Sequence, residues 1–114
     1  MKKDTFYRCM LRIYENKTKT FAVKTQGYSE GDIGLHKEKY SGELETWIAT
    51  HIPTGAVLAS AAHHCKTRTE ALKQAQCKIA EHTNFQEKVE QFKRGEKFKA
   101  FQRSRYDQSV TGVF

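Results

Sequence analysis

The stretch WIATHIPTGAVLASAAHHCKTRTEALKQAQCKIAE, residues 47–81, decides the fold of this chain. Leu, Thr and Ile alternate with other side chains over residues 44–52, which is the period of a half-buried β-strand. Pro53 presets φ for a turn and Gly55 accepts a positive φ, so the chain can reverse there. Residues 56–63 can then pair back on the first strand, and the stretch predicts a β-hairpin.

A helix is expected directly after this hairpin. Thr67 and Glu70 have the spacing of a capping box, in which the hydroxyl accepts from a backbone amide and the carboxylate turns back to the cap. Leu72, Ala75 and Ile79 then form one narrow apolar stripe. The sequence therefore predicts a strand–turn–strand–helix unit at the centre of the chain.

The segment before this unit predicts a second hairpin and an irregular loop. Residues 5–14 and 20–25 have strand patterns and are joined by a polar turn. Residues 26–43 contain four glycines and are expected to be the least regular part of the chain. We expect Ile33 and Leu35 either to fix this loop to the core or to form a short extra strand.

The C-terminal segment predicts a further helix and a tail. Asn84 and Glu87 repeat the capping-box spacing, which predicts a second helix over residues 85–94 or one bent helix through both segments. We therefore expect an α+β fold, with an antiparallel sheet of about four strands in two hairpins packed against one or two C-terminal helices. Residues 1–94 would form this single domain, and residues 95–114 a basic, aromatic tail.

Composition narrows the class of protein. A chain of 114 residues with 38% hydrophobic residues, twelve Phe and Tyr and one Trp is long and apolar enough for one folded domain. No apolar run reaches the ~20 residues that cross a bilayer, and no apolar region typical of a secretory signal follows the first lysines. Three widely spaced cysteines suit a reducing compartment. We therefore expect a cytoplasmic protein without a membrane partner.

The net charge of +7 is unevenly distributed. Residues 1–20 carry six Lys/Arg against two Asp/Glu, residues 21–62 carry three against five, and residues 63–114 carry eleven against six. A basic excess attracts polyanions, of which nucleic acid is the commonest in a cytoplasm. The alternative is that this charge only keeps a small domain soluble.

Basic and aromatic side chains are interleaved in the first strand and again over residues 93–105. Lys and Arg bind phosphates, and aromatic rings offer faces on which bases stack, although the same aromatic residues could instead form the core. Lys66 and Arg68 add charge at a helix N-terminus, where a phosphate is favoured. The predicted nucleic-acid-binding residues are Arg8, Arg12, Lys17, Lys19, Lys66, Arg68, Lys93, Arg94, Lys97, Lys99, Arg103 and Arg105. The predicted aromatic contacts are Phe6, Tyr14, Trp47, Phe98, Phe101 and Tyr106.

Catalytic and metal-binding motifs are absent from the sequence. It has no C-x2-C or H-x3-H pair, no P-loop and no G-x-S-x-G nucleophile motif. We therefore expect a non-enzymatic module with no metal and no cofactor. As an alternative, the acidic Gly-rich loop could imitate nucleic-acid phosphates and bind a host protein. The loop residues concerned are Glu30, Asp32, Glu38 and Glu43.

The central unit resembles the three-stranded-sheet-plus-helix DNA-binding domains of the AP2 and phage-integrase arm-binding families. The matching features are Trp47 in a strand, Gly55 in the turn and the T-x-x-E-A helix start at residue 67. The resemblance implies that the sheet lies in the DNA major groove, with Trp47, Ala49 and His51 facing DNA. The hairpin departs from those families because its strands carry no Arg or Lys.

Two further likenesses bear on function. The helix start is also similar to the last helix of double-stranded-RNA-binding domains, although no helix precedes the strands here. In its general character the chain is similar to accessory proteins of phages and mobile elements, including anti-CRISPR inhibitors. We therefore predict binding of nucleic acid mainly through phosphate contacts, and alternatively an inhibitor that blocks a host nucleic-acid-processing protein.

Overall fold

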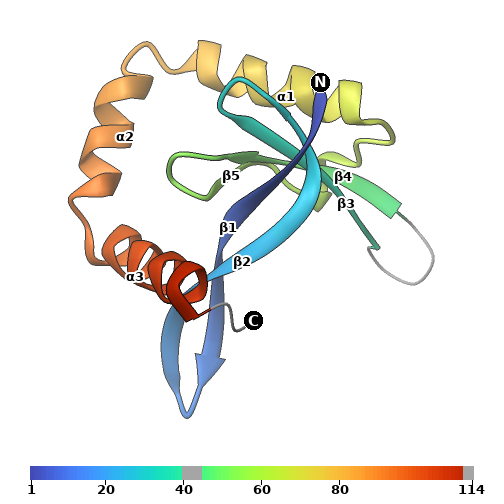
Figure 1. Ribbon diagram of the computed structural model, residues 1–114. Coiled ribbons are helices and arrows are strands. Elements are labelled where there is room, and N and C mark those ends of the chain that lie inside the picture. The colour runs from blue at the N-terminus through green and yellow to red at the C-terminus, as the bar shows by residue number, and fades with distance from the viewer. Residues whose placement is uncertain (40–44, 112–114) are drawn as a thin grey trace.

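The computed structural model describes residues 1–39 and 45–111, with the backbone alone at residue 62 and at residues 109–111. Strands precede helices along the chain (Figure 1). The elements are β1 (Lys2–Tyr14), β2 (Lys17–Glu30), β3 (Ile33–Lys39), β4 (Glu45–His51), β5 (Ala56–Ala59), a 3₁₀ turn (Ala61–His63), α1 (Arg68–Glu81), α2 (Phe85–Lys93) and α3 (Glu96–Thr111).

The predicted α+β class is confirmed. The strands form one antiparallel sheet in the order β1-β2-β3-β4-β5, so each strand pairs with its neighbour in sequence. Within residues 1–39 and 45–111 the sheet has five strands where about four were expected, and three helices follow it where one or two were expected. The additional strand, β3, lies within the segment expected to be irregular, and its Ile33 and Leu35 are buried in the core.

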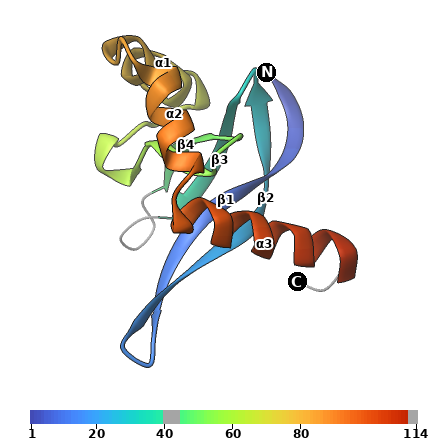
Figure 2. The same cartoon turned by 90° about the vertical axis from the view of Figure 1, so that its left-hand side faces the viewer.

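The first hairpin is the longest feature of the sheet. β1 and β2 pair continuously from Lys2 opposite Ser29 to Tyr14 opposite Lys17. Glu15 and Asn16 both have positive φ, as a two-residue type I′ hairpin turn requires. In both ribbon views the turn end of this hairpin extends beyond the rest of the molecule (Figures 1 and 2).

The sheet bends so that its first strand meets its last hairpin. The Cys9 amide of β1 donates to the carbonyl of Gly55 in the β4–β5 turn, at 2.9 Å. β2 pairs with β3 only from Tyr28 to Glu30. Among the described residues, the edge of β2 from Lys17 to Gln26 that faces away from β1 therefore has no strand partner.

One core lies between α1 and the second half of the sheet. Leu35 and Ala49 from the strands pack against Ala71 and Leu72 of α1. The predicted capping box is present at the start of this helix. The Glu70 amide donates to the Thr67 hydroxyl at 3.1 Å, and the Glu70 carboxylate accepts from the amide of the residue before the cap.

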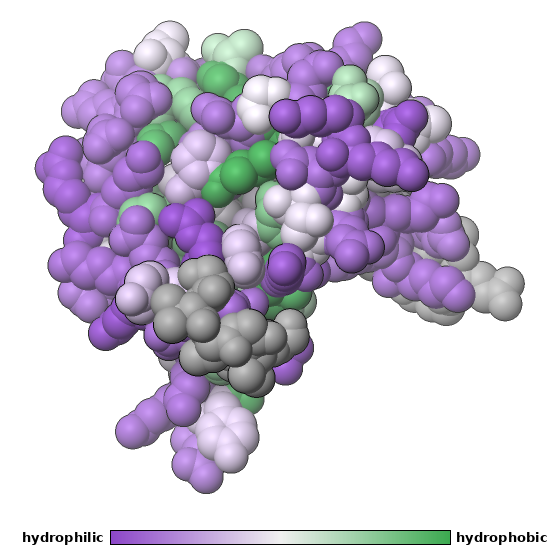
Figure 3. Space-filling model, in the orientation of Figure 1, coloured by the Kyte–Doolittle hydropathy of each residue, from purple (hydrophilic) through white to green (hydrophobic). Residues whose placement is uncertain are grey.

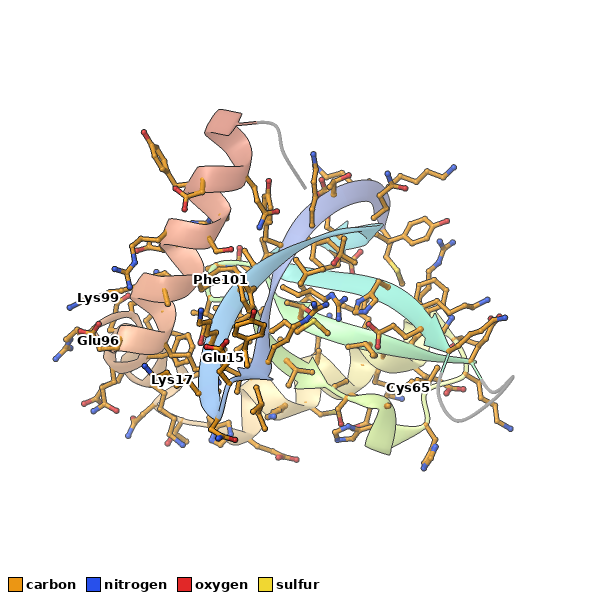
Figure 4. The ribbon with its side chains drawn as sticks, turned by 90° about the horizontal axis from the view of Figure 1, so that it is seen from below. Glu15, Lys17, Cys65, Glu96, Lys99 and Phe101 are labelled. Atoms are coloured by element: carbon orange, nitrogen blue, oxygen red, sulfur yellow. The ribbon has the colours of Figure 1, made fainter. Side chains whose placement is uncertain are left out.

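A second core lies between α3 and the first hairpin. Phe98 and Phe101 of α3 are buried and pack on Ala22 of β2, with the half-buried Tyr7 and Cys9 beside them. In Figure 4, Phe101 points from α3 toward these two strands. The segment expected to be a tail is therefore a helix packed against the sheet.

Candidate nucleic-acid interface

Helix α3 closes the open edge of β2 at one point. The Ala22 amide donates to the Ser104 hydroxyl at 3.0 Å, and the Gln108 side-chain amide donates to the Ala22 carbonyl at 2.6 Å. Two side chains of a helix thus take the place of a neighbouring strand. Because outward and inward backbone groups alternate in an antiparallel pair, Thr20 and Lys24 present their amides and carbonyls to the same edge.

An open groove of about 1160 Å³ follows this edge between β2 and α3. Its floor includes apolar side chains of both elements, such as Phe21 and Ala100. Five basic side chains line it against two acidic ones, Glu96 and Asp107. The basic residues are Arg12, Lys19, Lys24, Lys97 and Arg103.

The five basic side chains give the groove a net positive charge. All five are exposed, and within the part of the chain that the structure describes they form no ion pair. The ammonium of Lys97 also acts on Cys9: burial raises the pKa of this thiol, and the nearby positive charge opposes the rise. A groove with an excess of positive charge attracts polyanions.

Four of the predicted nucleic-acid-binding residues meet in this groove, namely Arg12 and Lys19 from the hairpin and Lys97 and Arg103 from α3. Lys24 was not predicted. Its sequence neighbourhood has no basic cluster, and only its position on the open edge of β2 brings it to the groove.

Several other predicted basic residues lie near the groove but outside its lining. Lys17 is at the turn of the hairpin, and Lys99 lies on the outer side of α3 (Figure 4). Lys99 pairs with Glu96 at 3.6 Å, and the Arg105 guanidinium lies 5.4 Å from the centre of the Phe101 ring. These residues extend the positive surface around the groove.

The remaining predicted basic residues have other surroundings. Arg8 is largely buried, pairs with Glu38 at 2.8 Å and donates to the Thr25 hydroxyl. Arg68 lies 4.0 Å from the centre of the Tyr28 ring at the start of α1. Figure 1 places α1 far from the turn of the first hairpin. Lys66 and Arg94 are exposed on the surface, and Lys93 lies 4.0 Å from Glu90.

Half of the predicted aromatic contacts are core residues. Phe6, Phe98 and Phe101 are at most 5% exposed, so their rings are not available for stacking on bases. Tyr14 and Tyr106 are more than 60% exposed.

The sheet face that the family resemblance implied for DNA contact is covered. Ala49 is fully buried in the core under α1. The His51 ring is buried 5.3 Å from the ring of Phe85 in α2. Trp47 is half-buried and packs against the same core. The implication that these residues face DNA is therefore wrong, because the helices occupy that side of the sheet.

The predicted acidic loop does not form one patch. Glu30 lies at the end of β2, 3.3 Å from the N-terminal amine, and Asp32 is in the turn that follows. Glu38 is near the other end of β3, and Glu43 lies outside the described residues. The acidic charges are thus separated by most of the length of β3.

Glu38 belongs to a partly buried cluster with Arg8 and His36. His36 is 4% exposed, and its Nε2 lies 3.0 Å from the Glu38 carboxylate. Burial lowers the pKa of His36. Burial also raises the pKa of Glu38, but its hydrogen bond with His36 and the charge of Arg8 outweigh this and lower it overall. Within residues 1–39 and 45–111, no serine, threonine or cysteine side chain is hydrogen-bonded to His36.

Two kinds of feature are absent from the described residues. No group of three or more His, Cys, Asp or Glu is placed to hold a metal ion. No helix among these residues is long and apolar enough to span a membrane.

Comparison with known proteins found no matching family model, no similar curated protein and no similar solved structure. The groove and the surface around it are therefore the features that indicate a function.

Proposed function

We propose that this protein is a non-enzymatic module that binds single-stranded nucleic acid in the groove between β2 and α3. One observation carries the proposal. Two basic segments from opposite ends of the chain, the first hairpin and α3, lie on the two sides of a single groove. Such a groove tracks a phosphate backbone, whose charge dominates nucleic-acid affinity.

The contact between the two walls of the groove favours one strand over a duplex. α3 is hydrogen-bonded directly to β2 through Ser104 and Ala22, so the two walls meet at the floor. A single extended strand can follow walls that join in this way more easily than a rigid double helix can.

The chemistry of the groove suits phosphates more than particular bases. Lys97 and Arg103 supply cations from α3, and the backbone amides on the open edge of β2 supply further donors. Phe21 is 38% exposed within the groove and offers an apolar surface for a base. The hydrogen-bonding side chains of Ser104 and Gln108 are already engaged with the Ala22 backbone, so we expect weak sequence selectivity.

The test is fluorescence anisotropy with a labelled oligonucleotide at low salt. In one variant, Lys97→Gln and Arg103→Gln remove two groove charges. In the matched control, Lys73→Gln and Lys78→Gln remove two exposed charges from α1, away from the groove. We expect the groove variant to bind about tenfold more weakly or worse, and the control to bind nearly as well as wild type.

Two outcomes would overturn the proposal. Equal losses in the two variants would mean that total charge, and not the groove, governs binding. No binding by the wild-type protein at low salt would remove nucleic acid as the ligand and favour the alternative of a host protein partner.

A further inference from the structure

The turn end of the first hairpin carries exposed apolar side chains. Ile13 is 81% exposed and Leu11 is 51% exposed, which are high values for aliphatic residues. Tyr14, at the last paired position, is 61% exposed. We refer to residues 11–20 as the hairpin tip. Figure 3 shows it projecting from the body, with mostly hydrophilic side chains around a few apolar ones.

The apolar residues of the hairpin tip are held in a fixed arrangement. The strands remain paired up to Tyr14 and Lys17, and the two-residue turn matches the twist of the strands. Leu11 and Ile13 alternate with Arg12, so they share one face of the hairpin. This is the face on which Cys9 packs toward α3.

The hairpin tip is continuous with the proposed binding groove. Leu11 lines the groove, and Ile13 pairs with Thr18, another lining residue. Ile13 is not part of the lining. The exposed aliphatic surface therefore begins where the groove ends, whereas Arg12 and Lys19 pair across the strands and lie on the opposite face of the hairpin.

If a nucleic acid occupies the groove, the surface of that ligand best suited to cover an aliphatic side chain is the flat face of a base pair. Ile13 cannot hydrogen-bond a base edge, but aliphatic side chains pack against the flat faces of base pairs. A nucleic-acid strand that continues from the groove into a duplex would place the last base pair of that duplex at the hairpin tip. The excess positive charge of the adjoining groove favours this polyanion over an apolar protein surface.

We infer that the preferred ligand is a nucleic acid with a junction between single strand and duplex, with the last base pair packed against Ile13. This inference rests on the proposed function, because the groove holds the single strand. The hairpin tip adds a contact that a free single strand lacks.

The experiment compares three labelled oligonucleotides: a single strand, a blunt duplex, and the same duplex with that single strand as an overhang. The variant Ile13→Thr keeps the β-branched side chain and changes its polarity, so the strand is preserved. The control Val57→Thr makes a similar change at an exposed residue of β5, outside the groove lining. Wild type and control should bind the overhang about fivefold more tightly than the single strand.

The variant Ile13→Thr should lose this preference and keep the affinity for the single strand. Equal affinity of wild type for overhang and single strand would overturn the inference while leaving the groove intact. Absence of all nucleic-acid binding would instead reject the proposed function. A parallel sedimentation assay with anionic phospholipid vesicles would overturn the inference if Ile13→Thr weakened vesicle binding alone.

Discussion

At the scale of single residues, His36 makes stability depend on pH. Burial lowers the pKa of His36 below its ordinary 6.5. Just below that pH, the imidazole of this residue therefore binds a proton more readily in the unfolded chain than in the folded chain. Stability should therefore fall as pH decreases through 6.5. The variant His36→Gln retains an amide donor for Glu38, does not titrate, and should show a shallower decline. Urea unfolding at pH 7.5 and 5.5 measures this, and identical declines in both proteins would contradict it.

Gly55 is a second residue with a measurable effect. Its φ is +73°, and an added Cβ would lie 2.6 Å from the Phe101 ring and 2.9 Å from the Cys9 amide nitrogen. Gly31 has a similar φ of +58° with no atom within 4 Å of such a Cβ. We expect Gly31→Ala to cost about 1 kcal/mol of unfolding free energy and Gly55→Ala about 3 kcal/mol. Equal costs in chemical denaturation would show that the contact with Phe101 is unimportant.

At the scale of elements, Phe101 is the most deeply buried of the side chains that attach α3 to the sheet. Phe101 is fully buried between α3 and the first hairpin, so Phe101→Ala should lower the unfolding free energy by about 3–5 kcal/mol. It should also speed hydrogen exchange in α3 and weaken nucleic-acid binding. Gln102→Ala changes an exposed neighbour and serves as the control. Slow exchange in α3 of the Phe101 variant would mean that the edge contacts of Ser104 and Gln108 suffice.

The elements that the sequence predicted are those whose signals are local. The start of α1 follows from Thr67 and Glu70 alone, and the hairpin before it from alternation and a Pro-Thr-Gly turn. β3 was only one of two alternatives because Gly34 suggested a loop. The structure shows the long-range reason for that glycine: an added Cβ would lie 2.7 Å from the ring of Phe6 in β1.

The difference between local and long-range signals also explains how much of the candidate site the sequence predicted. The basic residues of the hairpin and of α3 are visible as two clusters in the sequence. Their convergence is not, because α3 is positioned by Phe98 and Phe101 against Ala22, about eighty residues away. The role of the buried aromatic residues also could not be predicted from the local sequence, because a ring flanked by lysines suits either a core or a stacking surface.

At the scale of the whole molecule, the distribution of charge sets the salt dependence of binding. The net charge is +7, but only five cations line the groove. If these five neutralise phosphates of a single strand, the slope of log K against log salt should be no steeper than about −3.5. Removing Lys97 and Arg103 should reduce its magnitude by about 1.4. An anisotropy series in salt measures both, and a much steeper slope would place the binding surface beyond the groove.

The contact of α3 with the edge of β2 also has a consequence for solubility. An open strand edge is a template on which other chains add strands, and it leads to aggregation. Ser104 and Gln108 occupy the middle of this edge at Ala22, and the lysines on either side repel a second copy. The helix that forms one wall of the groove thereby protects the protein from polymerising through its own sheet.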